Sequence, residues 1–185
     1  MTISVNVGNI VHEVKEGIIV QQVNAQGVMG SGVAKDIREK YPQVFEAYSR
    51  AVGPAYTQYQ NGRHLLGMMI PVQVDTNLWV CNIVGQQFFG RDPHLQPTGQ
   101  YTSYDALAVG FKSLRHFALE NFVLTEDLRW ATRPVINFPL IGCGLGGADW
   151  NIVSSIIETC LPSFKKTLWV LTESDKPGVG THPAA

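Results

Sequence analysis

Apolar runs alternate with amphipathic segments along the 185-residue chain. Continuous or alternating apolar residues predict β-strands, whereas apolar residues at three- and four-residue intervals predict helices. The strands predicted in this way are Ile3–Val7, Ile18–Val23, Leu65–Val72, Leu78–Val84, Val135–Leu140 and Leu168–Leu171. Because helical segments separate most of them, we expect an α/β domain with a mostly parallel or mixed sheet.

Three segments have the pattern of helices. Val33–Tyr48 is predicted to form two pieces, because Pro42 interrupts it. A second helix is expected to start at Thr102, where "TSYD" fits a capping box. The third is Asp149–Cys160, with Asp149 favoured as its N-cap over a contact with a ligand.

Two glycine-rich stretches each follow an apolar run. They are "GVMGSGVAKDI" at Gly27–Ile37 and "IGCGLGGADW" at Ile141–Trp150. Glycine lets a ligand approach the backbone closely, and free amides at a helix start favour phosphate. One such stretch would fit an ordinary tight turn equally well. Two of them, both at strand-to-helix junctions, indicate a cleft with amides on both sides, suited to a diphosphate.

Known nucleotide-binding loops fit these stretches poorly. The first lacks the Lys-Ser/Thr pair of a Walker A loop, and its glycines do not follow GxGxxG. The second does match GxGxxG, through Gly142, Gly144 and Gly147. It lies too near the chain's end for a complete dinucleotide domain to follow, so an NAD or sugar-nucleotide enzyme of the Rossmann type ranks low.

Composition narrows the class of protein. Hydrophobic residues make up 45% of the chain and charged residues 16%, with a net charge of -1, which fits one soluble globular domain. No basic excess indicates a grip on a long nucleic acid. The N-terminus does not resemble a signal peptide, and no apolar stretch is long enough to span a membrane. We therefore expect a cytoplasmic protein without a membrane partner.

The three cysteines, Cys81, Cys143 and Cys160, show no CxxC spacing. A disulfide framework or a zinc site is not expected, and a reducing compartment fits best. No metal cluster or cofactor motif is visible, so we expect metal-independent chemistry. Nothing indicates oligomerisation, and a monomer is the expectation.

Several segments together resemble the macrodomain family of ADP-ribose-binding proteins. They are "GNI" at Gly8–Ile10 and the segments Ile19–Pro42, Val80–Gln87, Tyr101–Leu107 and Ile136–Trp150. The likeness covers about residues 1–172, and 173–185 are expected to be a disordered tail. It is greatest to the branch of ADP-ribose 1″-phosphate phosphatases and terminal ADP-ribose glycohydrolases. The resemblance implies a three-layer α/β/α fold with a six-stranded mixed sheet.

The resemblance also implies a ligand site. Asn9 matches the family's Asp that accepts from the adenine amine, and its carbonyl keeps an acceptor without the charge. Thr172 or Glu173 would border the adenine. The residues expected to bind ADP-ribose are Gly8, Asn9, Ile10, Asn24, Val28, Met29, Gly30, Ser31, Gly32, Val33, Gln86, Leu140, Ile141, Gly142, Cys143, Gly144, Leu145, Gly146 and Thr172.

The chain differs from part of the family it resembles in the residues expected to catalyse a reaction. The terminal ADP-ribose glycohydrolases use a Lys and an Asp, where this chain has Gly85 or Gln86 and Gly146. The remaining candidates are Asn24, which could order a water, and His94 with Asp92, which could reach over the distal ribose as acid or base. For His94 and Asp92, a role as solvated loop residues is favoured over catalysis. Cys143 could have a lowered thiol pKa at a helix start, or simply pack.

Two classes of function remain open. One is a hydrolase that removes the 1″-phosphate of ADP-ribose 1″-phosphate or releases ADP-ribose from a modified protein or nucleic acid. The other is a non-catalytic module that binds ADP-ribose or a related NAD metabolite. The missing Lys and Asp favour the module, whereas the absence of an attached second domain favours the enzyme.

Overall fold

The computed structural model describes residues 2–59, 62–90, 92, 94, 96–122 and 133–177. Its strands are β1 (Ser4–Val7), β2 (Gly17–Asn24), β3 (Met69–Asp75), β4 (Leu78–Gln86), β5 (Ile136–Phe138) and β6 (Lys166–Val170). Its α-helices are α1 (Ile10–Glu13), α2 (Gly32–Lys40), α3 (Pro42–Tyr59), α4 (Tyr104–Phe122) and α5 (Trp150–Cys160). Two short 3-10 helices, η1 (Arg63–Leu65) and η2 (Glu173–Asp175), complete the elements.

The six strands form one mixed sheet in the order β1-β6-β5-β2-β4-β3. Each neighbouring pair is parallel except β3 and β4, which are antiparallel. The long strand β2 lies at the centre, where Ile18 pairs with Ile136 of β5 on one side and with Trp79 of β4 on the other. This confirms the predicted mixed six-stranded sheet.

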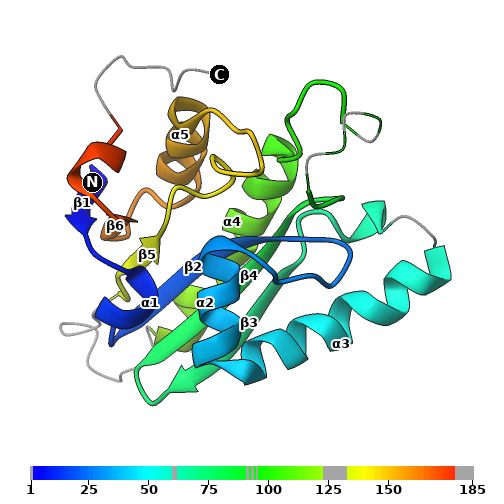
Figure 1. Ribbon diagram of the computed structural model, residues 1–185. Coiled ribbons are helices and arrows are strands. Elements are labelled where there is room, and N and C mark those ends of the chain that lie inside the picture. Colours follow the sequence, from blue (N-terminus) through cyan, green and yellow to red (C-terminus); the bar gives the residue numbers. More distant parts are fainter. Residues whose placement is uncertain are drawn as a thin grey trace.

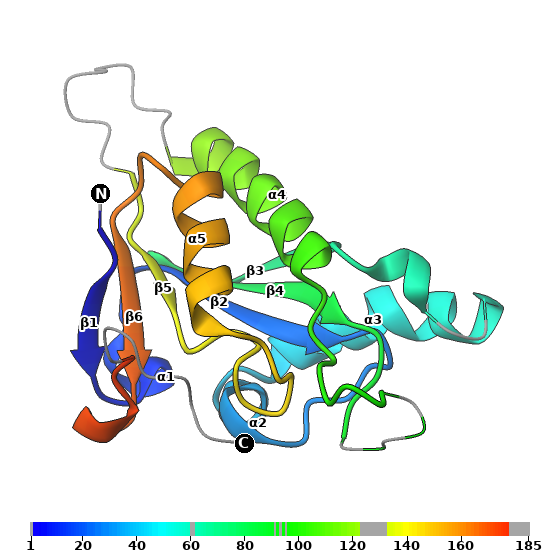
Figure 2. The ribbon, with the colours of Figure 1, turned by 90° about the horizontal axis from the view of Figure 1, so that it is seen from above.

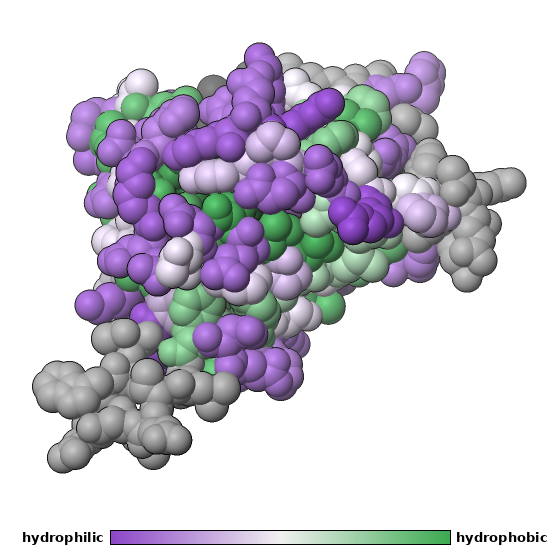
Figure 3. Space-filling view, turned by 90° about the horizontal axis from the view of Figure 1, so that it is seen from below, coloured by the Kyte–Doolittle hydropathy of each residue, from purple (hydrophilic) through white to green (hydrophobic). Residues whose placement is uncertain are grey.

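Helices cover both faces of the sheet, as Figures 1 and 2 show. Alternate residues of β2 separate the two cores: Ile18 and Val20 pack with α4 and α5, whereas Ile19 and Val23 pack with α1, α2 and α3. Such alternation is what a strand buried on both faces requires. The predicted three-layer α/β/α architecture is therefore confirmed. The surface seen from below is mostly hydrophilic, with hydrophobic residues exposed between the hydrophilic ones (Figure 3).

Most predicted element positions are confirmed, including the break before Pro42 and the N-cap at Asp149, whose side chain accepts from the Asn151 amide. The strand predicted to start at Leu65 begins instead at Met69, because Arg63–Leu65 forms η1. The four-residue helix α1 was not predicted.

The predicted capping box at Thr102 is wrong. Helix α4 begins at Tyr104, and the Ala106 amide donates to the hydroxyl of Ser103 instead. Thr102 pairs as an isolated bridge with Gln86, so its hydroxyl lies inside the molecule rather than at a helix end.

The last described segment also differs from expectation. Residues 173–175 form η2, closed by a true capping box between Thr172 and Asp175, where disorder was expected from 173 onward. Residues 178–185 of the expected tail lie outside the described residues. No described helix has the length and apolar character needed to cross a membrane.

Candidate functional site: a cleft between two glycine loops

A cleft of about 810 Å³ opens at the carboxyl ends of the central parallel strands. We call residues 25–31, which join β2 to α2, the first loop, and residues 139–149, which join β5 to α5, the second loop. Both loops line the cleft, together with the starts of α1 and α2 and the ends of β4 and β6. Ligands of open α/β sheets bind at this edge, so the cleft is the candidate site.

Buried side chains hold the first loop in place. The Asn24 side-chain oxygen accepts from the amides of Gln26 at 2.9 Å and Val28 at 3.2 Å, while its Nδ2 donates to the Val28 carbonyl at 2.7 Å. The hydroxyl of Tyr48, fully buried on α3, lies 2.6 Å from the Asn24 carbonyl and 2.9 Å from its Oδ1, and it accepts from the Gly27 amide at 3.0 Å. Burial raises the pKa of Tyr48. The hydroxyl therefore stays protonated as a donor to Asn24.

The Asn24 amide is thus mostly engaged in holding the first loop. Its oxygen accepts from two amides and lies within hydrogen-bond distance of the Tyr48 hydroxyl, and one of its two N–H groups donates to the Val28 carbonyl. Asn24 still lines the cleft, so a single N–H is left to face a water or a ligand.

Backbone bonds and close packing hold the second loop. The Ala148 amide donates to the Gly142 carbonyl at 2.9 Å, and the Thr102 amide donates to the Gly146 carbonyl at 3.0 Å. A Cβ on Gly146 would lie only 2.3 Å from the Thr102 hydroxyl and 2.5 Å from the Gly142 carbonyl oxygen. The position matching the family's Asp therefore has no room for a side chain in this arrangement.

A chain of neutral polar groups lies behind the second loop. Gln22 Nε2 donates to Gln86 Oε1 at 2.6 Å and to the Thr102 hydroxyl at 3.0 Å, and that hydroxyl donates to the Gly142 carbonyl at 3.2 Å. Gln86, which with Gly85 stands near the position of the Lys implied by the resemblance, is held in turn by its own bond to the Phe88 carbonyl at 2.7 Å. Buried Gln22 Oε1 has no hydrogen-bond partner among the described residues. The described hydrogen bonds behind the second loop thus join amides, a hydroxyl and a backbone carbonyl, all of them neutral.

The opposite end of the cleft is lined by Asn9, Ile10, Asp36 and Trp169. Asn9 caps α1 by accepting from the Val11 amide at 2.9 Å, and its Nδ2 donates to Asp36 Oδ2 at 3.2 Å. The Trp169 indole donates to Asn137 at 2.9 Å, which fixes the ring beside Gly8. The half-buried Trp169 ring and the Asp36 carboxylate line the same cleft, and together they suit a planar group that carries N–H donors.

Cys143 is not an activated thiol. Burial, and to a lesser extent Asp149, raises its pKa to about 12. Its Sγ donates to the Ile141 carbonyl at 3.3 Å. The thiol is protonated at neutral pH, so the hypothesis of a lowered pKa is wrong and the packing interpretation holds.

The structure brings most of the predicted ligand residues to one cleft. Those that line it are Gly8, Asn9, Ile10, Asn24, Val28, Gly30, Ser31, Gly32, Val33, Gln86 and residues 140–146. Met29 does not, because its side chain is buried in the core against α3. Thr172 also lies off the cleft, although its neighbours Leu171 and Asp175 line it.

The two catalytic candidates in the long loop after β4 do not line the cleft. Asp92 Oδ1 accepts from the His94 amide at 2.9 Å, and the Asp92 carbonyl accepts from the Tyr101 hydroxyl at 2.9 Å. Both side chains are exposed. This arrangement is a local turn and matches the solvated-loop interpretation.

Sequence reasoning missed Gln22, Asp36 and Trp169, which line the cleft. A signal existed for Gln22, because Gln21 and Gln22 interrupt an otherwise apolar strand. The sequence gives no such signal for Asp36 and Trp169. Each lies on a regular element, α2 or β6, whose hydrophobic pattern indicates only how that element packs.

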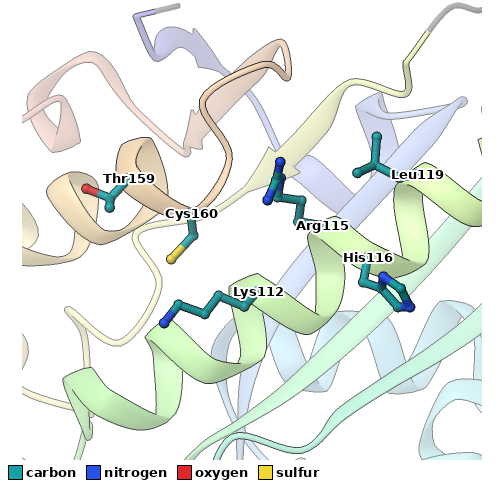
Figure 4. Close-up of a pocket in the computed structure, with 6 residues that line it drawn as sticks. All are labelled: Lys112, Arg115, His116, Leu119, Thr159 and Cys160. Carbon is teal, nitrogen blue, oxygen red and sulfur yellow. The ribbon is translucent and has the colours of Figure 1, made fainter.

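A second cavity, of about 410 Å³, lies between α4 and α5 (Figure 4). Its lining is Lys112, Arg115, His116, Leu119, Thr159 and Cys160, and it shares no residue with the cleft. His116 pairs with Glu120 at 2.9 Å. Across the described ranges, no group of three His, Cys, Asp or Glu residues is placed to hold a metal ion.

The fold is a three-layer α/β/α domain with a ligand cleft at the carboxyl ends of its parallel strands. Residues 20–157 match the family model called Macro domain. The chain belongs to the Macro domain family. It is 26% identical over 138 residues to a DNA ADP-ribosyl glycohydrolase of Mycobacterium tuberculosis, a match covering 73% of this chain and 32% of that relative. The chain thus spans about a third of the length of the curated relatives it matches.

Solved structures share the fold. The macrodomain of Mycobacterium tuberculosis DarG aligns with a TM-score of 0.67 at 21% identity, covering 91% of this chain and 98% of that one. A macrodomain protein from Streptomyces coelicolor aligns at 0.65 and 22% identity, covering 91% and 98%. A protein of unknown function from Bacteroides thetaiotaomicron aligns at 0.72 and 24%, also covering 91% and 98%.

Proposed function

We propose that the cleft binds ADP-ribose or an ADP-ribose derivative substituted at the 1″ carbon. The observation that carries this proposal is the pair of loops on opposite sides of one cleft. The first turn of the nine-residue helix α2, from Gly32 to Ala34, lines it, and helix geometry leaves these amides without partners inside the helix. Such amides and the helix dipole favour phosphate.

The charges of the cleft fit this mode of binding. Among the described residues that line it there is no Lys, Arg or His, so an anion there would be held by backbone amides rather than by cations. Its volume of about 810 Å³ lies in the range of sites for ligands of nucleotide size. The aromatic and acidic end beside Asn9 would then receive the base, and the Gln22–Gln86–Thr102 end the distal ribose.

We further propose that the chain hydrolyses the bond at the 1″ carbon. The names of the curated relatives favour release of ADP-ribose from a modified macromolecule such as DNA, and the 1″-phosphate ester is the other candidate substrate. No strong base among the described residues faces the distal-ribose end. Turnover would therefore rest on positioning, with a water ordered by the free Asn24 N–H, by Gln86 or by the ligand's own phosphate.

A non-catalytic binding module is the second candidate function. It is favoured because Gln86 and Gly146 replace the Lys and Asp, and because the Cys143 thiol stays protonated. The carboxylates that line the described cleft are Asp36, beside Asn9, and Asp175, in η2. In the proposed mode of binding both would lie near the base and away from the bond at the 1″ carbon.

The experiment that separates these functions is a turnover assay on three substrates. The purified chain is incubated with ADP-ribose 1″-phosphate, ADP-ribosylated DNA and an ADP-ribosylated protein, and released phosphate and ADP-ribose are measured. Release from a substrate establishes the hydrolase and names its leaving group. Protection against unfolding by ADP-ribose, about 3 kcal/mol at a hundredfold excess over the dissociation constant, without any release establishes the binding module.

A further inference from the structure

The base end of the cleft contains an unusual arrangement around Asn9. Its side-chain oxygen is committed to the Val11 amide at 2.9 Å, because Asn9 is the N-cap of α1. Its nitrogen points to Asp36 at 3.2 Å. The Asn9 side chain therefore presents an N–H group to Asp36, while its oxygen already accepts one hydrogen bond from the backbone of α1.

Asp36 supplies a charged acceptor beside Asn9. It lies half-buried on the second turn of α2 and lines the cleft. Its Oδ2 accepts from Asn9, and within the described residues this amide is its one hydrogen-bond partner. The bond orients the carboxylate and leaves Oδ1 to accept a donor from the cleft.

Asp175, the other carboxylate at this end, has a different role. Its Oδ2 accepts from the Thr172 amide at 3.0 Å and from the Thr172 hydroxyl at 2.7 Å, and these two bonds close η2. Asp175 is also exposed, so water competes for it. Of the two, Asp36 is the acceptor that is both oriented and partly shielded.

From this geometry we infer that Asp36 determines base specificity, by accepting a hydrogen bond from the exocyclic amine of adenine. The inference rests on the proposed function. An amine opposite an oriented carboxylate gains a charge-assisted bond. A 6-oxo purine such as hypoxanthine places a carbonyl oxygen against the carboxylate, which is repulsive. The cleft therefore selects 6-amino over 6-oxo purines through a residue of α2 rather than through position 9.

Calorimetric titration with ADP-ribose and with inosine diphosphate ribose tests the inference on wild type, Asp36→Asn and Glu39→Gln. We expect wild type to prefer ADP-ribose by roughly 10- to 100-fold. Asp36→Asn keeps a carbonyl for Asn9 and turns an N–H toward the ligand, so it should lose that preference while binding the inosine ligand as well as wild type or better. Glu39→Gln removes the same charge from an exposed position of α2 and should keep the preference.

The outcomes distinguish a failure of the role of Asp36 from a failure of the proposed ADP-ribose binding. If wild type binds neither ligand, the proposed function itself fails. If wild type binds ADP-ribose and Asp36→Asn retains the full preference, the role of Asp36 is overturned. The inosine ligand also controls for folding, because a damaged Asp36→Asn protein would lose both ligands together, and thermal unfolding would show it.

Discussion

The two glycine loops face each other across one cleft, yet they are held by different means. The first depends on side chains behind it, Asn24 at the end of β2 and Tyr48 on α3, which together make six hydrogen-bond contacts with the loop or with each other. The second depends on its own backbone and on close contact with Thr102. Although the two loops have similar compositions, we expect them to respond differently to mutation, because different contacts hold them.

The glycines differ in the same way. A Cβ on Gly30 of the first loop would meet its nearest atom, on Val28, at 3.8 Å, which is ordinary contact. In the second loop a Cβ on Gly146 would overlap both Thr102 and a backbone carbonyl. Glycine leaves the first loop open to a ligand, whereas in the second it is also required for packing.

The largest effect is expected from Asn24→Ala. It removes the side-chain oxygen that accepts from two loop amides and the side-chain nitrogen that donates to the Val28 carbonyl, so we expect a loss of about 3 kcal/mol in the free energy of unfolding. Urea denaturation measures this loss. Asn121→Ala, which removes one exposed bond on α4, is the control and should change stability by less than about 0.5 kcal/mol. Equal effects of the two variants would mean that Asn24 does not hold the first loop.

Gly146→Ala should be the next most severe change. Overlap with Thr102 and the Gly142 carbonyl predicts a cost of about 2–3 kcal/mol, because backbone must move to accept the methyl group. Gly30→Ala is its matched control in the other loop and should cost no more than about 0.5 kcal/mol. Comparable unfolding midpoints for the two variants would contradict the difference between the loops.

Tyr48→Phe tests whether the hydroxyl of Tyr48, on α3, holds the first loop in place. Removing the hydroxyl leaves the Gly27 amide and the Asn24 oxygens with fewer partners, and about 1–2 kcal/mol of stability should be lost. Tyr41→Phe is the control, since the Tyr41 hydroxyl has no hydrogen bond within the described part of the chain. The idea of a loop held by Tyr48 would be abandoned if both variants unfolded at the same urea concentration.

The smallest effect concerns Cys143 in the second loop. Its pKa of about 12 means that the folded state holds the thiol proton more tightly than the unfolded chain does. This stabilising contribution is complete below the unfolded value of 9.0 and is lost as the pH rises toward 12. At pH 8 we expect iodoacetamide to label Cys143 at least ~100-fold more slowly than free cysteine. Mass spectrometry of the labelled peptide would show faster reaction if the thiol were activated.

The periodicity of the strands and the break at Pro42 are local signals, and they predicted an α/β domain and most of its elements. The three layers and the six strands of the sheet were implied by the resemblance to macrodomains. The sequence also placed both loops correctly, through their glycines. It misread Thr102, where a local capping pattern lost to the contacts with Gln22 and Gly142. It could not pair Asn9 with Asp36, which are 27 positions apart and meet only because α2 packs beside α1. Contacts of this kind depend on how distant elements pack, so no local pattern predicts them.

Calorimetric titration of the chain with ADP-ribose tests the central claim most directly. The account predicts saturable binding at one site per chain, weakened in Asn24→Ala, where the first loop is released. An absence of binding to folded wild-type protein would contradict it, and the two glycine loops would then enclose a different ligand on the same fold.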